Sequence, residues 1–350
     1  MGIQKEICSL SASEYNVTSF DFLDLMKFIA SIFLFSMHFK ALNDFGNASF
    51  LLELMARWGV PFFFISSSFF LFSKSDNGNI TQSTLIKYVQ RIIRLYLFWF
   101  IVNLPYVVYV NRKNIFKIKA WLSFLKNALL SSTFLGSWFL VSCAFSACIL
   151  YFASKKWKTG AIVFALFPLY MLCIFSSSYY GLLIPALRPV LNYLRFPLNI
   201  FNGCFFFALG KYISEYKAIL CEKYTIKKSI IGVVFFYLLF FVEIYLCRKR
   251  SVFKTSNAAF SLVPISFFLF LLCIQITVQI KNHVKLRKLS TVIYCGQANV
   301  KCLWGVGEQY LHIGSYTLLY LVSVSIMAVI CVVVLNLQKK AKWNWCKYIA

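Results

Sequence analysis

Long apolar segments separated by short basic loops recur along the whole chain. A helix needs about 20 mostly apolar residues to cross the roughly 30 Å hydrocarbon core of a bilayer. Nine segments meet this requirement well and one, 290–304, meets it more weakly. The pattern therefore predicts an all-α, polytopic protein with about ten transmembrane helices. The stronger predicted spans are 22–39, 51–72, 92–110, 134–153, 160–176, 198–213, 229–247, 260–280 and 314–336.

Composition supports the membrane assignment. Hydrophobic residues make up 60% of the chain and charged residues 13%, whereas soluble domains contain roughly 45 to 50% apolar residues. Residues 1–19 are polar and lack the pattern of a cleaved secretory signal, so we expect the first apolar segment to remain as a span. Without a long linker or a fixed repeat, the chain is predicted to form a single transmembrane domain over 1–350. Its polar N-terminal tail is about 1–19 and its basic C-terminal tail about 338–350.

The net charge of +25 would indicate nucleic acid in a soluble protein, but here most basic residues fall in the loops between apolar segments. This distribution is the topology signal of a multi-pass membrane protein, so lipid is an expected partner and nucleic acid is not. The segments that carry more Lys and Arg predict that both termini are cytoplasmic.

Two ionisable residues, Lys27 and His38, lie within the first apolar segment. A lysine near the bilayer centre costs about 3 kcal/mol, so such residues are usually functional or paired. Eleven residues make about three helical turns, which places both on one face roughly 16 Å apart, with Asp24 close to that face. His38 is either a general base for transfer to an alcohol or a histidine bonded between helices. The aligned Lys27 and Asp24 favour the functional interpretation.

Basic residues also cluster at the start of the third span, where Lys87, Arg91 and Arg94 share one side of a predicted helix. Such a cluster either binds phosphates or anchors the helix among lipid headgroups.

In the second span, Arg57 precedes Pro61 and three consecutive serines, of which Ser67 is the middle one. Serines in a membrane helix usually allow close packing, and a nucleophilic serine would need an adjacent base. No Cys or His cluster has the spacing of a zinc site, so no metal is expected.

Taken together, the motifs FDFLDLMKFIASIFLFSMHF, RWGVPFFFISSSFFLF and YVQRIIRLYLFWF resemble, in order and spacing, the first three helices of the acyltransferase 3 family. LGSWFLVSCAF, which contains Trp138, FNGCFFFALGKYI and LRKLSTVIYCGQANV, which contains Tyr294, resemble later motifs of the family. The resemblance covers most of the chain and implies a membrane O-acyltransferase that modifies bacterial surface glycans.

The resemblance also implies roles for individual residues. His38 matches the histidine required for acyl transfer, Lys27 stands at the position of an arginine, and Asp24 matches an acid three residues earlier. These three are the expected catalytic residues, with Lys27 and Asp24 orienting or charge-balancing the acyl path. Arg91 and Arg94 match paired arginines for which contact with the phosphates of acyl-coenzyme A is expected. The matches Arg57, Ser67, Trp138 and Tyr294 are expected to be substrate or structural motif residues.

Several positions depart from the family pattern. Lys27 keeps the charge but loses the planar fork of arginine. Ser68 replaces a glycine, Gln297 stands where the late motif has a histidine, and Gly136 and Ser137 precede Trp138 in place of a polar aromatic residue. These departures leave His38 as the main candidate base.

The sequence thus predicts an acetyltransferase of the bacterial inner membrane. It would move acetyl from cytoplasmic acetyl-coenzyme A to a sugar hydroxyl of a lipid-linked or surface polysaccharide of the O-antigen or capsule type, with separate periplasmic or glycan-assembly partners. The alternatives are a glycan flippase or transporter, in which Lys27 and His38 line a pathway, and a polysaccharide polymerase.

Overall fold

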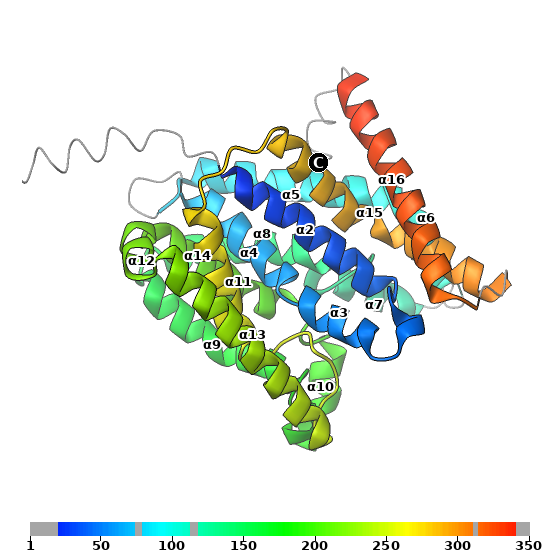
Figure 1. The fold of residues 1–350 in the computed structure, drawn as a ribbon, viewed down its shortest axis with the longest axis horizontal. Coiled ribbons are helices and arrows are strands. Elements are labelled where there is room, and N and C mark those ends of the chain that lie inside the picture. Colours follow the sequence, from blue (N-terminus) through cyan, green and yellow to red (C-terminus); the bar gives the residue numbers. More distant parts are fainter. Residues whose placement is uncertain (1–19, 74–78, 113–117, 311–313, 341–350) are drawn as a thin grey trace, which may run out of the picture.

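The computed structural model describes residues 20–73, 79–112, 118–310 and 314–340. Every regular element within these ranges is helical, which confirms the all-α prediction (Figure 1). The first half contains α2 (Asp21–His38), η1 (Asn43–Phe45), α3 (Ala48–Ala56), α4 (Gly59–Phe72), α5 (Gln82–Val102), α6 (Leu104–Asn111), α7 (Ile118–Leu130), α8 (Trp138–Ala153) and α9 (Thr159–Phe175). The second half contains η2 (Tyr180–Leu182), η3 (Pro185–Leu187), α10 (Arg188–Tyr193), α11 (Ile200–Glu215), α12 (Lys217–Lys223), α13 (Ile226–Lys249), α14 (Leu262–Gln275), α15 (His283–Tyr310) and α16 (Tyr316–Lys340).

Each of the ten predicted spans is helical, but their number as complete spans is not confirmed. Among the described residues, three helical stretches are long and apolar enough to cross a membrane: Ala48–Phe72, Ile226–Lys249 and Tyr316–Gln338. A fourth results if α5 and α6, bent by 63°, are counted as one. The apolar helices α8, α9 and α14 have 16, 17 and 14 residues, fewer than the roughly 20 that a perpendicular span requires. The predicted tail 1–19 and most of the tail 338–350 lie outside the described residues.

Helices α2 and α15 form the most extensive helix pair in the structure, and they run parallel. Asp24 near the start of α2 contacts Arg287 on α15, and His38 at the end of α2 contacts Lys301. Since both pairs are separated by the same number of residues along the chain, the two helices stay in register over about four turns. The pairing therefore fixes both ends of the helix that carries Asp24, Lys27 and His38.

Helix α11 lies at the centre of the bundle, and its residues from Asn202 to Lys211 are all buried. It packs against α4, α8 and α9, which surround it (Figure 1). Two glycines permit this approach. A Cβ atom on Gly210 would lie 2.4 Å from the carbonyl oxygen of Ile65, and one on Gly203 would lie 2.5 Å from the Cβ of Ser142. Small residues let membrane helices approach to backbone contact in this way.

Helix α7 is amphipathic, and the sequence pattern did not predict a span at this position. Its apolar stripe is 52–79% exposed, whereas Lys119, Ser123 and Asn127 on the opposite face line a cavity. The stripe consists of Ile118, Trp121, Leu122, Leu125 and Leu129. An exposed apolar stripe opposite a polar face is typical of a helix lying along the surface of a bilayer.

The start of α16 is held by Asp44, which lies in the distant η1. The Asp44 carboxylate accepts hydrogen bonds from the backbone N–H groups of Tyr316 at 3.1 Å and Thr317 at 2.8 Å. These bonds, the Thr317 contacts above all, hold the pKa of Asp44 below its usual value. A carboxylate at a helix N-terminus satisfies donors that have no partner within the helix.

The close packing at Gly210 predicts the effect of a single methyl group. Gly210→Ala should lower the free energy of unfolding by about 2 kcal/mol, because the new atom meets backbone that has no room to move. Gly160→Ala is the matched control, since its Cβ would meet nothing nearer than 3.9 Å. Thermal unfolding of both variants in detergent tests this; equal midpoints would show that α4 and α11 separate without cost.

Candidate active site

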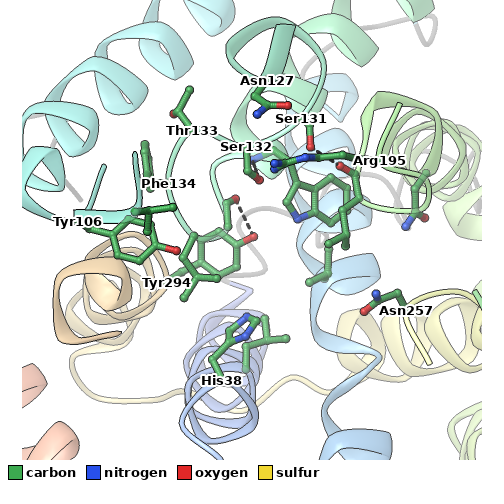
Figure 2. Close-up of a pocket in the computed structure, with 18 of the residues that line it drawn as sticks. His38, Tyr106, Asn127, Ser131, Ser132, Thr133, Phe134, Arg195, Asn257 and Tyr294 are labelled. Atoms are coloured by element: carbon green, nitrogen blue, oxygen red, sulfur yellow. Dashed lines mark hydrogen bonds between the residues drawn. The ribbon is translucent and has the colours of Figure 1, made fainter. Parts of the chain in front are cut away.

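A cavity of about 620 Å³ opens at the C-terminal end of α2. It contains four of the residues that the sequence singled out, His38, Arg57, Trp138 and Tyr294. Figure 2 shows His38 on one side of this cavity and Asn127, Ser131, Ser132 and Arg195 on the other. We call it the His38 pocket; its lining also includes Met37, Pro61, Tyr106, Asn111, Lys119, Ser123, Phe124, Thr133, Phe134, Gly136, Asn202 and Asn257.

His38 is half-buried, and its imidazole has no hydrogen-bond partner among the described residues. Its backbone carbonyl accepts a hydrogen bond from Lys301 Nζ at 3.0 Å, which ties the last turn of α2 to α15. The ring is therefore held in place through its backbone while both ring nitrogens remain available. A histidine in this state is able to exchange a proton with a bound hydroxyl group.

Arg57 lies beside the pocket at the junction of α3 and α4, and its guanidinium group is engaged on three sides. It forms an ion pair with Glu53, donates to Ser256 Oγ at 2.7 Å and contacts Asn257. Ser256 in turn donates to Glu53 at 2.6 Å. Because the Glu53 carboxylate balances its charge, Arg57 links α3 to the loop before α14 and adds little net charge to the pocket.

Trp138 and Tyr294 form an aromatic wall of the pocket. Trp138 is buried and packs against Phe64, with ring centroids 5.5 Å apart. The Tyr294 hydroxyl donates to the carbonyl of Gly136 at 3.2 Å (Figure 2). Gly136 has a φ of +82°, and a Cβ there would lie 3.3 Å from both the Tyr294 ring and the amide nitrogen of Gln297. Glycine is thus the residue that suits both this conformation and this space.

Gln297 occupies the position at which the family resemblance implies a histidine. It is 1% exposed, and neither atom of its amide has a hydrogen-bond partner among the residues described here. It lies between Tyr294 and Lys301 on one face of α15. The side chain therefore sits behind the pocket wall and does not line it.

The other end of α2 carries a separate charged group, which we call the Asp24 cluster. Asp24 accepts contacts from Lys27 Nζ at 3.4 Å, His283 Nδ1 at 3.0 Å and Arg287 at 3.5 Å. Asp21 lies 3.3 Å from the same His283 nitrogen and accepts the backbone N–H of Ile280. Lys27 also lies over the ring of Phe70 at 4.5 Å. The sequence analysis singled out Asp24 and Lys27, which contact each other here, but it did not select His283 and Arg287, which fall in a basic stretch that looked like a topology signal.

Arg91 and Arg94 are exposed on α5 and line neither the His38 pocket nor the second cavity described below. Arg91 is close enough to Lys27 to act on it electrostatically, so it belongs to the same end of the bundle. Ser67 lies in the middle of α4, where its hydroxyl is 2.7 Å from the Tyr88 hydroxyl. It does not reach the pocket, which agrees with a packing role for this serine.

A second cavity, of about 850 Å³, adjoins Phe20 at the start of α2. We call it the lysine basin because five lysines line it. Its most buried lysine, Lys211, forms an ion pair with Glu215 and donates to Thr159 Oγ1 at 3.1 Å. The five are Lys155, Lys156, Lys158, Lys211 and Lys217. Within the described part of the chain, no group of three or more His, Cys, Asp or Glu residues is arranged to hold a metal ion.

This arrangement, an all-helical bundle with a histidine pocket at one end of its first long helix, agrees with the family expectation. The model of the acyltransferase 3 family, described as an acyltransferase domain, matches residues 20–350, and the chain belongs to this family. A curated relative, an amino-acid racemase from Enterococcus faecalis, is 26% identical over 334 residues. The match covers 91% of this chain and 45% of the relative, so the chain spans less than half of that protein's length. No solved structure matches the chain.

The Asp24 cluster predicts a stability effect. Asp24→Asn should lower the free energy of unfolding by about 3 kcal/mol, because Lys27, His283 and Arg287 lose the carboxylate that they share. Glu222→Gln, which removes an exposed carboxylate from α12, is the control and should change little. Thermal unfolding in detergent distinguishes the two; an Asp24→Asn midpoint as high as that of the control would show that Asp24 does not hold α2 to α15.

Proposed function

We propose that this protein is a membrane O-acetyltransferase. It takes acetyl from acetyl-coenzyme A at the cytoplasmic face of a bacterial inner membrane and transfers it to a sugar hydroxyl of a lipid-linked or surface polysaccharide. Membership of the acyltransferase 3 family supports the reaction class. The observation that carries the proposal is the imidazole of His38, which lines the pocket of about 620 Å³ and has no hydrogen-bond partner among the described residues.

The reaction assigned to His38 is general-base catalysis. A ring nitrogen accepts the proton of the sugar hydroxyl while the hydroxyl oxygen attacks the thioester carbonyl. The new C–O ester bond forms, the C–S bond breaks, and the proton passes to the departing thiolate. The pocket supplies hydroxyl and amide groups from Ser132, Asn127 and Asn257 that suit a polyhydroxylated acceptor.

We assign the donor, acetyl-coenzyme A, to the end of the bundle opposite the His38 pocket. Arg91 and Arg94 are exposed cations there, and the lysine basin adds four lysines besides the buried Lys211, so this end suits the phosphates of a coenzyme. Lys27 and His38 are roughly 16 Å apart along α2, and the acyl group has to be delivered over this distance. With both termini cytoplasmic, as the loop charges predict, the His38 pocket faces the outer side.

The name of the Enterococcus faecalis relative raises an amino acid as a different substrate. An amino acid carries an ammonium group, which normally pairs with a carboxylate. The lining of the His38 pocket includes no Asp or Glu, and the nearby Glu53 is paired with Arg57. The pocket therefore favours a neutral or anionic acceptor.

Replacement of the base tests the mechanism. His38→Ala should abolish acetylation of the surface glycan in cells, because no other histidine among the described residues lines the pocket. The variant should retain the thermal unfolding midpoint of the wild type, and mass spectrometry of the glycan measures the loss of acetyl units. Full acetylation by a folded His38→Ala protein would refute this mechanism. A flippase or transporter would instead change export, and a polymerase would change chain length, with no new ester.

The coenzyme site has its own test. Arg94→Ala should raise the KM for acetyl-coenzyme A about tenfold with little change in kcat, since a charge-assisted bond to phosphate contributes about 1.5 kcal/mol. Arg250→Ala, an exposed arginine at the end of α13, should leave the KM unchanged. An unaltered KM in Arg94→Ala would assign this arginine to lipid headgroups.

A further inference from the structure

The His38 pocket has an unbalanced charge. Among the described residues, its lining includes Arg57, Lys119 and Arg195 but no Asp or Glu. Glu53 neutralises Arg57, whereas neither Lys119 nor Arg195 forms an ion pair with a residue in the described ranges. Charged groups beside a cavity that the protein itself leaves unpaired are suited to pair with a ligand of the opposite sign.

The backbone holds Arg195 in a conformation that favours glycine. Its φ is +55°, and its N–H and C=O are both bonded, to Asn192 at 3.0 Å and from Leu198 at 2.8 Å. An L-residue in this region costs roughly 1 kcal/mol, and such strain concentrates at functional sites. The guanidinium group points toward the Ser131–Ser132 turn across the pocket from His38 (Figure 2).

Two buried amides lie near this arginine with unused acceptor atoms. Asn127 is 9% exposed and Asn202 is 5% exposed; both line the pocket, and neither Oδ1 atom has a hydrogen-bond partner among the described residues. Asn202 is oriented by its own amide nitrogen, which donates to the carbonyl of Pro197 at 3.0 Å. Buried acceptors of this kind require donors such as the hydroxyl groups of a ligand.

Helix α7 supplies the route by which an amphiphile reaches the pocket. Its polar face contributes Lys119, Ser123 and Asn127 to the lining, and its opposite face is the exposed apolar stripe. A helix with this division lies at the surface of the bilayer, at the depth of phosphate headgroups. A ligand with an apolar tail in the membrane would thus present its phosphate and its sugar to the pocket under α7.

We propose that the His38 pocket binds the phosphate of a lipid-linked glycan acceptor, with Arg195 and Lys119 contacting the phosphate and Asn127 and Asn202 accepting sugar hydroxyls. This inference rests on the proposed transferase function and narrows its acceptor class. It assigns Arg195 to acceptor binding, on the opposite side of the pocket from the proton-accepting His38.

Binding of farnesyl phosphate to the full-length protein in neutral phosphatidylcholine nanodiscs tests the proposal. Arg195→Gln should raise the Kd at least tenfold, Arg195→Lys should raise it less, and Arg250→Gln should leave it unchanged. Arg195→Gly separates binding from folding: glycine suits the positive φ, so this variant should keep the wild-type unfolding midpoint while losing affinity. Farnesol, which lacks the phosphate, should not bind measurably.

Three further probes assign the anion. Glucose 1-phosphate that binds with the same dependence on Arg195 while farnesyl phosphate does not would overturn the lipid-linked acceptor and indicate a soluble sugar phosphate. Tighter binding of glucuronate than of either phosphate would overturn the proposal. So would an Arg195-dependent site for acetyl-coenzyme A, or equal affinities of wild type and Arg195→Gln. The His38→Ala protein should bind farnesyl phosphate normally, so a failed transferase mechanism and a failed acceptor site give different results.

Discussion

The parallel pairing of α2 with α15 is the constraint on which the rest of the structure depends. It is fastened at both ends by charge, with Asp24 bound to His283 and Arg287 at one end and the carbonyl of His38 bound to Lys301 at the other. A helix with two aspartates and a lysine would be costly alone in a bilayer. Packed against a basic partner, the same residues become the contacts that fix its register, and the position of His38 follows from that register.

The centre of the bundle is organised by size and not by charge. Gly210 and Gly203 bring α11 into backbone contact with α4 and close to α8. Ser68, which stands where the family resemblance implies glycine, is fully buried, and its Cβ would lie 2.8 Å from a Cβ on Gly210. The extra bulk on α4 is thus accommodated because the residue facing it is glycine. This departure alters packing far from the pocket and leaves the lining of the site unchanged.

Apolar segment length and charge placement were enough to predict most of the helices. The motif order singled out His38, Arg57, Trp138 and Tyr294, and the structure brings these four to one pocket. Two things could not be predicted from the sequence. The number of complete spans depends on where helices bend or end early, as at Asn103 between α5 and α6. The partners of Asp24 and the surroundings of the polar face of α7 depend on contacts between segments far apart in the chain. A local pattern of Lys and Arg is the same whether the residues face water, lipid or a carboxylate.

The two ends of α2 differ in charge balance, and that difference distinguishes a stabilising cluster from a candidate reaction site. In the Asp24 cluster, two carboxylates face Lys27, Arg287 and His283, so the charges are nearly matched and each group has a partner within the protein. The His38 pocket is lined by Arg195 and Lys119 together with amide oxygens and an imidazole that have no partner among the described residues, and none of those residues contributes an acid to the lining. A cluster in which each charge is paired within the protein has its contacts completed by folding alone. A group of charges without partners gains its missing contacts when a ligand binds, so we expect the acyl transfer at the His38 end. Asp24 and Lys27 hold the helix that positions His38.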